Sequence, residues 1–192
     1  MLVTMLQPLI RVSVALATVL VLSGCTQPAE QASAATPQAS QVAAIAASAF
    51  VVVPAAERQP VPAWDGRLLD DSAWSSAQLT GKVTVVNFWA SWCAPCAAEW
   101  PELVAANTEL TDVQFLGFNE YDDVDDARAF VGAYGDAYAH VFDPNGTFFE
   151  SLPGMPTGNL PTTIVVDAEG RIAAWKTGVV TGIEIKKAVA RV

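Results

Sequence analysis

The chain has 192 residues, of which 52% are hydrophobic and 16% charged, and its formal net charge is −10 at pH 7. This composition excludes an intrinsically disordered protein, and the length suits one folded domain with extensions. Twenty acidic side chains against ten basic ones exclude the basic surface that nucleic-acid binding requires.

The first 24 residues have the pattern of a signal peptide. Arg11 is their only charged side chain, and the apolar run 12–22 has eleven residues, against the ~20 of a membrane-spanning helix. The motif that follows, Leu22-Ser23-Gly24-Cys25, resembles the lipobox of bacterial lipoproteins, whose cysteine receives diacylglycerol. The resemblance implies cleavage before Cys25, lipidation of its thiol and anchoring on the extracytoplasmic side of the bacterial cell membrane. An uncleaved signal anchor is the alternative.

Residues 25–60 are dominated by Ala, Gln, Ser and Pro, a composition typical of a flexible tether. A short helix at Ala43–Ala49 and a short edge strand at Phe50–Val53 are alternatives for the end of this segment. We predict that the folded domain covers residues 61–192, beginning with a turn at Asp65-Gly66.

The first half of the domain is predicted to form a βαβ unit. Its strands are apolar runs of the kind that is buried on both faces, and Pro95 suits the first turn of the helix between them. A right-handed crossover then makes the two strands parallel. The predicted order is strand Val83–Trp89, helix Cys96–Leu110, strand Val113–Phe118 and helix Asp125–Tyr134.

The second half is predicted to form an antiparallel hairpin and a last helix. The hairpin strands are Thr162–Asp167 and Arg171–Lys176, and the helix covers Thr181–Val192. Together the two halves predict an α/β protein with a three-layer α/β/α sandwich and a central mixed sheet.

The chemistry is predicted at the motif Trp92-Cys93-Ala94-Pro95-Cys96, which follows the buried strand and opens the helix. The helix dipole and the unpaired N–H groups there stabilise a Cys93 thiolate, which makes Cys93 the solvent-facing, attacking sulfur. Cys96, three residues on, can resolve a mixed disulfide on Cys93. Pro95 stiffens the ring between the cysteines. We expect a redox-active pair that needs no metal or other cofactor.

A zinc site and an inert structural disulfide are the alternatives for this motif. Zinc needs four ligands, and the domain offers two cysteines and one histidine, His140, which we expect to be buried or at a sheet edge. A copper chaperone needs a different cysteine spacing. A nearby acidic cluster lacks the glycine and register of a calcium loop, so we expect a solvated loop that caps the next helix. The cluster consists of Glu120, Asp122, Asp123, Asp125 and Asp126.

Three motifs in this order resemble the TlpA/ResA branch of thioredoxin-like proteins. They are the stretch from Val85 to Cys96, then Glu99 and Pro101, then Leu160-Pro161-Thr162-Thr163. The resemblance implies a thioredoxin fold over about residues 60–192 and a membrane-tethered, extracytoplasmic thiol-disulfide oxidoreductase, often one that reduces apocytochrome c. Asn87 stands where cytoplasmic thioredoxins carry a buried Asp. The chain departs from the pattern at residues 153–159, which are rich in Gly and Pro.

The leading prediction is a reductase of secreted client proteins with disulfides, kept reduced by a membrane thiol-disulfide electron donor. An oxidant that donates its disulfide to folding proteins uses the same residues, and the spacing of the cysteines does not choose between them. A lipid-anchored binding module with a structural disulfide is a third alternative. The Pro-x-x-x-Thr-x-x-Cys arrangement of peroxiredoxins is absent. We expect Trp92, Pro95 and Leu160 to contact the client.

Pro161 is predicted to follow a cis peptide bond and to face the dithiol. The resemblance places the family's cis-proline here, and without an N–H Pro161 cannot pair as an ordinary strand residue. The Leu160 backbone is then free to align an extended client beside Cys93. An ordinary trans proline at the start of a strand is the alternative.

Glu99 is predicted to be a proton shuttle for the dithiol. Spacing alone leaves open a solvated carboxylate in the first turns of the helix. Apolar neighbours favour a desolvated carboxyl with a raised pKa, and the resemblance places the family's acidic residue here. Such a group can take the proton from Cys96 and return it on reoxidation. The neighbours concerned are Phe88, Trp89 and Trp100.

Overall fold

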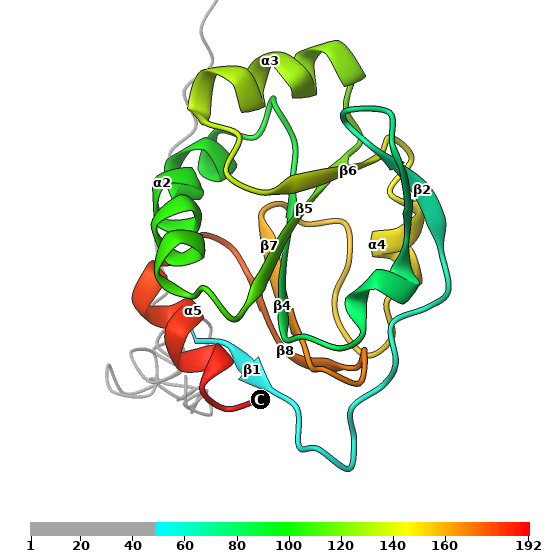
Figure 1. Cartoon of the computed structure of the whole chain (residues 1–192), viewed down its shortest axis with the longest axis vertical. Coiled ribbons are helices and arrows are strands. Elements are labelled where there is room, and N and C mark those ends of the chain that lie inside the picture. The colour runs from blue at the N-terminus through cyan, green and yellow to red at the C-terminus, as the bar shows by residue number, and fades with distance from the viewer. Residues whose placement is uncertain (1–48) are drawn as a thin grey trace, which may run out of the picture. The chain divides into compact units, whose positions relative to one another are not determined.

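The computed structural model describes residues 49–192 (Figure 1). They form an eight-stranded mixed sheet in the order β1-β8-β7-β4-β5-β6-β2-β3. The strands are β1 (Val51–Val52), β2 (Asp65–Leu68), β3 (Ala73–Ser75), β4 (Thr84–Trp89), β5 (Gln114–Glu120), β6 (Ala139–Asp143), β7 (Thr162–Val166) and β8 (Ile172–Thr177). The helices are η1 (Ser76–Leu79, 3-10), α2 (Ala94–Glu109), α3 (Val124–Tyr134), α4 (Thr147–Ser151) and α5 (Gly182–Val189).

Strand β4 lies in the middle of the sheet. All six of its residues are buried, and it runs parallel to β5 and antiparallel to β7. Successive side chains point to opposite faces. Val85 therefore packs under α2 and α5, whereas Val86 and Phe88 pack under the aromatic side chains of α4. Because β4 and β5 are parallel, their carboxyl ends lie side by side at the same end of the sheet, where β4 leads into the dithiol.

Helices cover both faces of the sheet. In Figure 1, α2 and α5 lie to the left of the strands, α3 lies above them, and α4 lies to the right beside β2. The core on the α2 and α5 side includes Leu103 and Ile185, and the core on the other side includes Phe148 and Phe149. The predicted βαβ unit, the antiparallel β7–β8 hairpin and the three-layer α/β sandwich are confirmed.

The turn predicted at Asp65-Gly66 is wrong. Both residues lie inside β2, and the chain reverses instead at residues 69–72, where the Leu68 N–H donates to the Ser72 carbonyl at 2.9 Å. Glycine at position 66 has a packing reason, because a Cβ there would lie 2.2 Å from the ring of Trp64. A close ring contact, and not a turn conformation, thus accounts for this glycine.

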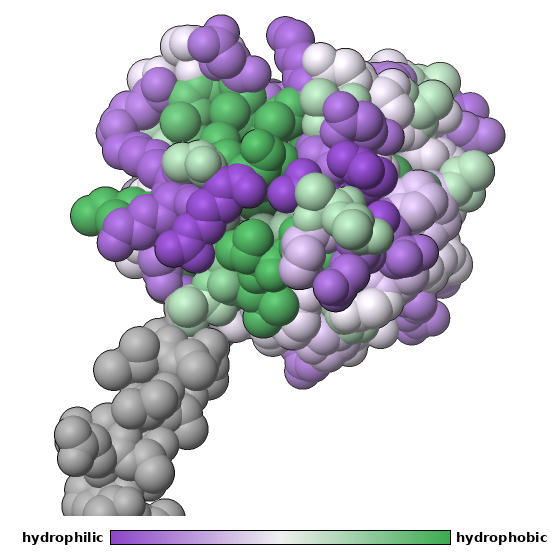
Figure 2. All heavy atoms as spheres, turned by 90° about the horizontal axis from the view of Figure 1, so that it is seen from below, coloured by the Kyte–Doolittle hydropathy of each residue, from purple (hydrophilic) through white to green (hydrophobic). Residues whose placement is uncertain are grey.

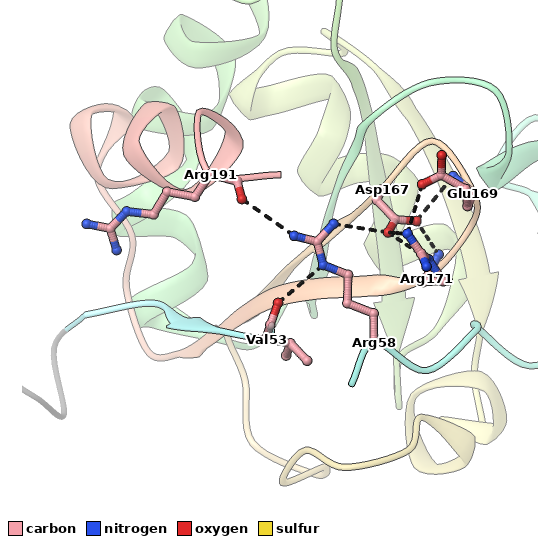
Figure 3. A network of polar contacts seen from close by, with 6 residues as sticks. All are labelled: Val53, Arg58, Asp167, Glu169, Arg171 and Arg191. Atoms are coloured by element: carbon pink, nitrogen blue, oxygen red, sulfur yellow. Dashed lines mark hydrogen bonds and ion pairs between the residues drawn. The ribbon is translucent and has the colours of Figure 1, made fainter. Parts of the chain in front are cut away.

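The folded domain begins about ten residues earlier than predicted. Strand β1 pairs with β8, and the Arg58 guanidinium reaches the Val53 carbonyl and the Asp167 carboxylate at 3.2 Å each (Figure 3). Asp167 also binds Arg171 in the turn of the β7–β8 hairpin. The last part of the segment predicted as a tether is therefore fixed to the sheet. The predicted signal peptide, Cys25 and the rest of the tether to residue 48 lie outside the described residues.

The β1 edge carries apolar surface. Figure 2, the view from below, shows hydrophobic residues gathered in patches between hydrophilic ones. A hollow of about 350 Å³ lies between the edge strands and the segment around Pro153, and its lining includes Val51, Ile172 and Trp175. This hollow contains neither cysteine of the predicted site.

Candidate active site

The dithiol lies at the N-terminus of α2, directly after β4. Cys93 caps the helix, and its sulfur accepts a hydrogen bond from the Cys96 N–H at 3.2 Å. The two cysteines form a disulfide with an S–S distance of 2.02 Å. The expectation that Cys93 faces solvent is wrong for the oxidised pair, because only 4% of Cys93 and 1% of Cys96 is exposed. That Cys93 is the attacking sulfur stays a prediction, and it rests on the position of Cys93 at the positive end of the helix.

The segment before the dithiol is held by the loop after β5. The Asp122 carboxylate accepts hydrogen bonds from the Ser91 N–H at 2.6 Å and the Ser91 hydroxyl at 2.7 Å. The indole N–H of Trp92 donates to the Tyr121 carbonyl at 3.0 Å. Sequence reasoning missed this use of Asp122. The available signal was that carboxyl ends of adjacent parallel strands meet, which brings residues after β5 to the residues after β4.

Glu99 lies fully buried on α2, one helical turn after Cys96. One of its carboxyl oxygens accepts from the Asn87 amide at 2.7 Å, and the other accepts from the Val180 N–H at 2.8 Å. Burial raises the pKa of Glu99 from 4.5 to about 7, against the opposing effects of these two hydrogen bonds and of the Lys176 charge. The predicted desolvation and raised pKa of this carboxyl are confirmed. Its role as a proton shuttle remains a prediction.

The Leu160-Pro161 peptide bond is cis, as predicted. Pro161 directly precedes β7, whose Thr162 pairs with Phe88 near the end of β4. Leu160 packs against the buried cluster that contains both cysteines. These contacts place the cis bond at the end of the sheet from which the dithiol emerges.

The side chains expected to contact a client differ in exposure. Trp92 is 62% exposed, Pro95 is exposed in the first turn of α2, and Leu160 is half-buried. Together they can offer apolar contact to a protein that reaches the nearly buried disulfide.

The acidic cluster after β5 is only partly a solvated loop. Asp123 caps α3 by accepting from the Asp125 N–H, as the cluster was expected to do. Glu120 contradicts that expectation, because it is fully buried and neither carboxyl oxygen has a hydrogen-bond partner within residues 49–192. Burial, with the charges of Asp143 and Glu150, raises its pKa from 4.5 to about 9. The reason is that Glu120 is still part of β5 and points into the core, while the loop begins one residue later.

His140 is buried in β6 and stacks on the ring of Trp100 at 5.2 Å between centroids. Desolvation lowers its pKa from 6.5 to about 3, so the imidazole is neutral at pH 7. Within residues 49–192, His, Cys, Asp and Glu side chains form no group of three or more that could hold a metal ion. No helix in that same range is both long and apolar enough to span a membrane.

Comparison with known proteins identifies the family. The family model described as the AhpC/TSA family matches residues 58–175, which include the dithiol, Glu99 and the cis-proline. This chain belongs to the AhpC/TSA family. The match begins at Arg58, in agreement with the earlier start of the domain found in the structure.

Curated relatives of this family member are thiol-disulfide proteins. HelX of Rhodobacter capsulatus, named a thiol:disulfide interchange protein, is 36% identical over 112 residues, which are 57% of this chain and 60% of HelX. The interchange protein DsbE of Allochromatium vinosum is 38% identical over 52% of this chain and 54% of its own length. ResA of Bacillus subtilis, named a thiol-disulfide oxidoreductase, is 27% identical over 55% and 58%. The chain thus spans less than two thirds of these relatives.

Solved structures match more completely. A DsbF homologue from Corynebacterium diphtheriae has a TM-score of 0.69 and 31% identity, covering 74% of this chain and 92% of its own. A secreted thiol-disulfide isomerase from Corynebacterium glutamicum has a TM-score of 0.68 and 31% identity, covering 72% and 88%. The thioredoxin-like fold and the resemblance to the TlpA/ResA branch are confirmed by these relatives.

Proposed function

We propose that this member of the AhpC/TSA family is an extracytoplasmic, membrane-anchored thiol-disulfide oxidoreductase that reduces disulfides of secreted clients. The observation that carries the proposal is the placement of three groups within the first two turns of α2: Cys93 at the helix start, Cys96 bonded to it, and Glu99 buried one turn further on. The interchange proteins and oxidoreductases among the relatives support the same chemistry.

The first step is attack by the reduced protein on a client disulfide. The Cys93 thiolate, stabilised by the start of α2 and the Cys96 N–H, bonds to one client sulfur and expels the other as a thiolate. The product is a mixed disulfide between Cys93 and the client. Trp92 and the backbone of Leu160 are proposed to hold the client segment during this step.

The second step releases the client. Glu99, ionised, takes the proton of the Cys96 thiol, and the Cys96 thiolate attacks the sulfur of Cys93. The Cys93–Cys96 disulfide forms, and the client leaves with both sulfurs reduced. Two electrons have passed from the dithiol to the client, so a membrane dithiol donor is proposed to restore the pair. The redox group is the disulfide itself, with no other cofactor.

Location and client are proposed from the sequence. The lipobox-like motif at Leu22–Cys25 supports a lipid anchor on the extracytoplasmic side of the bacterial cell membrane, and the word "secreted" in the name of one solved relative agrees with export. Apocytochrome c, which the TlpA/ResA resemblance implies, is proposed as one client. Growth with a radiolabelled fatty acid should label the wild-type protein and leave Cys25→Ala unlabelled. Equal labelling of both would refute lipidation at Cys25.

Insulin reduction by dithiothreitol tests the enzymatic proposal. The full-length chain should accelerate precipitation of the insulin B chain, and Cys93→Ala and Cys96→Ala should each abolish the acceleration. If the wild-type chain has no effect, the disulfide is structural, and the result supports the alternative of a lipid-anchored binding module. A reduction potential near ~−120 mV would favour the disulfide-donating oxidant, whereas one near ~−270 mV supports the reductase.

A further inference from the structure

A buried lysine lies behind the dithiol helix. Lys176 on β8 is 6% exposed and is the one lysine or arginine that is buried within residues 49–192. Its ammonium pairs with the Glu184 carboxylate on α5 at 2.7 Å. A buried charge is costly, so an ion pair at this depth needs a physical or functional reason.

Lys176 is connected to Glu99 through two neighbours. In the β7–β8 ladder it stands opposite Thr163, whose hydroxyl accepts from the Asn87 amide at 3.1 Å. The same amide donates to Glu99 at 2.7 Å. Lys176 thus lies beside the polar network that holds the buried carboxyl, and its positive charge lowers the pKa of Glu99.

Glu184 determines how much of the Lys176 charge acts on its surroundings. One Glu184 oxygen binds Lys176, and the other accepts from the N–H and the hydroxyl of Thr181 at 2.9 and 3.0 Å in a capping box. The residue before Thr181 is Val180, whose N–H holds Glu99. The start of α5 therefore binds the negative partner of Lys176 to Thr181, the residue next to the Val180 N–H that fixes Glu99.

Few other titratable groups face Glu99. On its own helix they are the two cysteines, which form the disulfide, and Glu102, whose carboxylate accepts from the Gly182 N–H at 2.8 Å. Ahead of β6 it is Tyr138. Burial and the Glu99 charge raise the pKa of Tyr138 well above its usual range, so the phenol is neutral. Lys176 from β8 is the charged side chain that acts on this carboxyl, and Glu184 from α5 is the ion-pair partner of Lys176.

We propose that the Lys176–Glu184 pair is an electrostatic regulator of the dithiol, in which Lys176 favours the ionised form of Glu99 and Glu184 limits that effect. Both are positioning residues, since neither touches the sulfurs. The proposal rests on the proposed role of Glu99 for its consequence in catalysis. Its electrostatic part concerns the proton affinity of Glu99 and is measured without any client.

The two partners should act in opposite directions. Lys176→Met removes the stabilising charge, so the titration midpoint of Glu99 should rise by about half a pH unit, roughly threefold in proton affinity. Glu184→Gln leaves the Lys176 charge uncompensated, so the midpoint should fall by a similar amount. A merely structural pair predicts no such opposition, since loss of either partner would then only loosen the fold.

The midpoint is measured by ¹³C NMR of carboxyl-labelled glutamate in the oxidised full-length chain in detergent micelles, where the cysteines do not titrate. Glu99→Gln assigns the resonance. Lys186→Met and Glu109→Gln are the matched controls, because this exposed pair, between α5 and α2, carries the same charges as the Lys176–Glu184 pair. Neither control should move the midpoint. Lys176→Arg keeps the charge and should leave the midpoint near the wild-type value.

Shifts in the same direction for Lys176→Met and Glu184→Gln, or no shift in either, would overturn the proposal. If Lys176→Met does not fold, the fall in Glu184→Gln and the unchanged midpoint in Lys176→Arg decide it. The pH at which the resolving step of insulin reduction accelerates should shift together with the Glu99 titration midpoint in each variant. Absence of insulin reduction in the wild type would instead overturn the proposed function, while the NMR titration still tests the electrostatic coupling.

Discussion

Replacing Glu120 by Gln should make the stability of the protein less dependent on pH. Glu120 ends β5 opposite Asp143 of β6, is fully buried, and has no hydrogen-bond partner for either carboxyl oxygen within residues 49–192. Burial and the neighbouring negative charges raise its pKa from 4.5 to about 9. At pH 7 this carboxyl is therefore neutral in the folded protein and ionised in the unfolded chain.

The sign and size follow from proton linkage. Between pH 4.5 and 9 the folded state holds one more proton at Glu120 than the unfolded state, so the free energy of unfolding falls as the pH rises. The slope is ~1.4 kcal/mol per pH unit. The free energy of unfolding has its full Glu120 contribution below pH 4.5, where the carboxyl is protonated in both states. By pH 7 that free energy has fallen by roughly 3 kcal/mol. Gln has no proton to lose, so the variant gains on the wild type as the pH rises.

Guanidinium unfolding of the oxidised protein at pH 5, 6, 7 and 8, followed by tryptophan fluorescence, measures the effect. The difference in unfolding free energy between Glu120→Gln and the wild type should grow by ~1.4 kcal/mol per pH unit at an unchanged m-value. Glu99, with a pKa of about 7, adds a slope of the same sign that cancels in the difference. Glu57→Gln, at an exposed position, should show no such trend. A pH-independent difference would refute the reasoning.

Four more outcomes are expected. Cys96→Ala should accumulate mixed disulfides on Cys93, seen by non-reducing electrophoresis; equal trapping by Cys93→Ala would contradict the assignment of Cys93 as the attacking thiol. In stopped-flow assays the wild-type resolving step should speed up as the pH rises through about 7, where Glu99 ionises, and Glu99→Gln should slow it at least ~10-fold and remove this pH dependence; an unchanged rate would return Glu99 to a structural role. Trp92→Ala should raise KM for a protein client more than it changes the reduction potential, because this indole is 62% exposed; an unchanged KM would contradict client contact. Asp167→Ala should cost about 1–3 kcal/mol in guanidinium unfolding, because Arg58 loses its carboxylate partner; a loss below about 0.5 kcal/mol would show that water replaces the carboxylate.

The local sequence was sufficient to predict that the dithiol lies between a buried strand and the start of a helix. An apolar run long enough for one buried strand, followed by Cys-x-x-Cys with Pro95 in the first helical turn, predicts a dithiol at a helix N-terminus wherever the rest of the chain lies. The structure has this arrangement at Cys93. These features depend on backbone preferences and on neighbours within a few residues, which a single sequence displays.

The burial of individual carboxyl groups was decided by tertiary packing. Glu99 gains its partner Val180 from 81 positions along the chain, and only the position of α5 against α2 brings that N–H to it. Glu120 and Asp122 stand two residues apart in the same acidic run. Yet Glu120 is buried in the core with no hydrogen-bond partner among residues 49–192, whereas Asp122 binds Ser91. The start of the domain was predicted too late for the same reason, because Arg58 binds Asp167, a residue 109 positions further along the sequence. A side chain's solvation depends on what distant elements pack over it, and local propensity does not encode that contact.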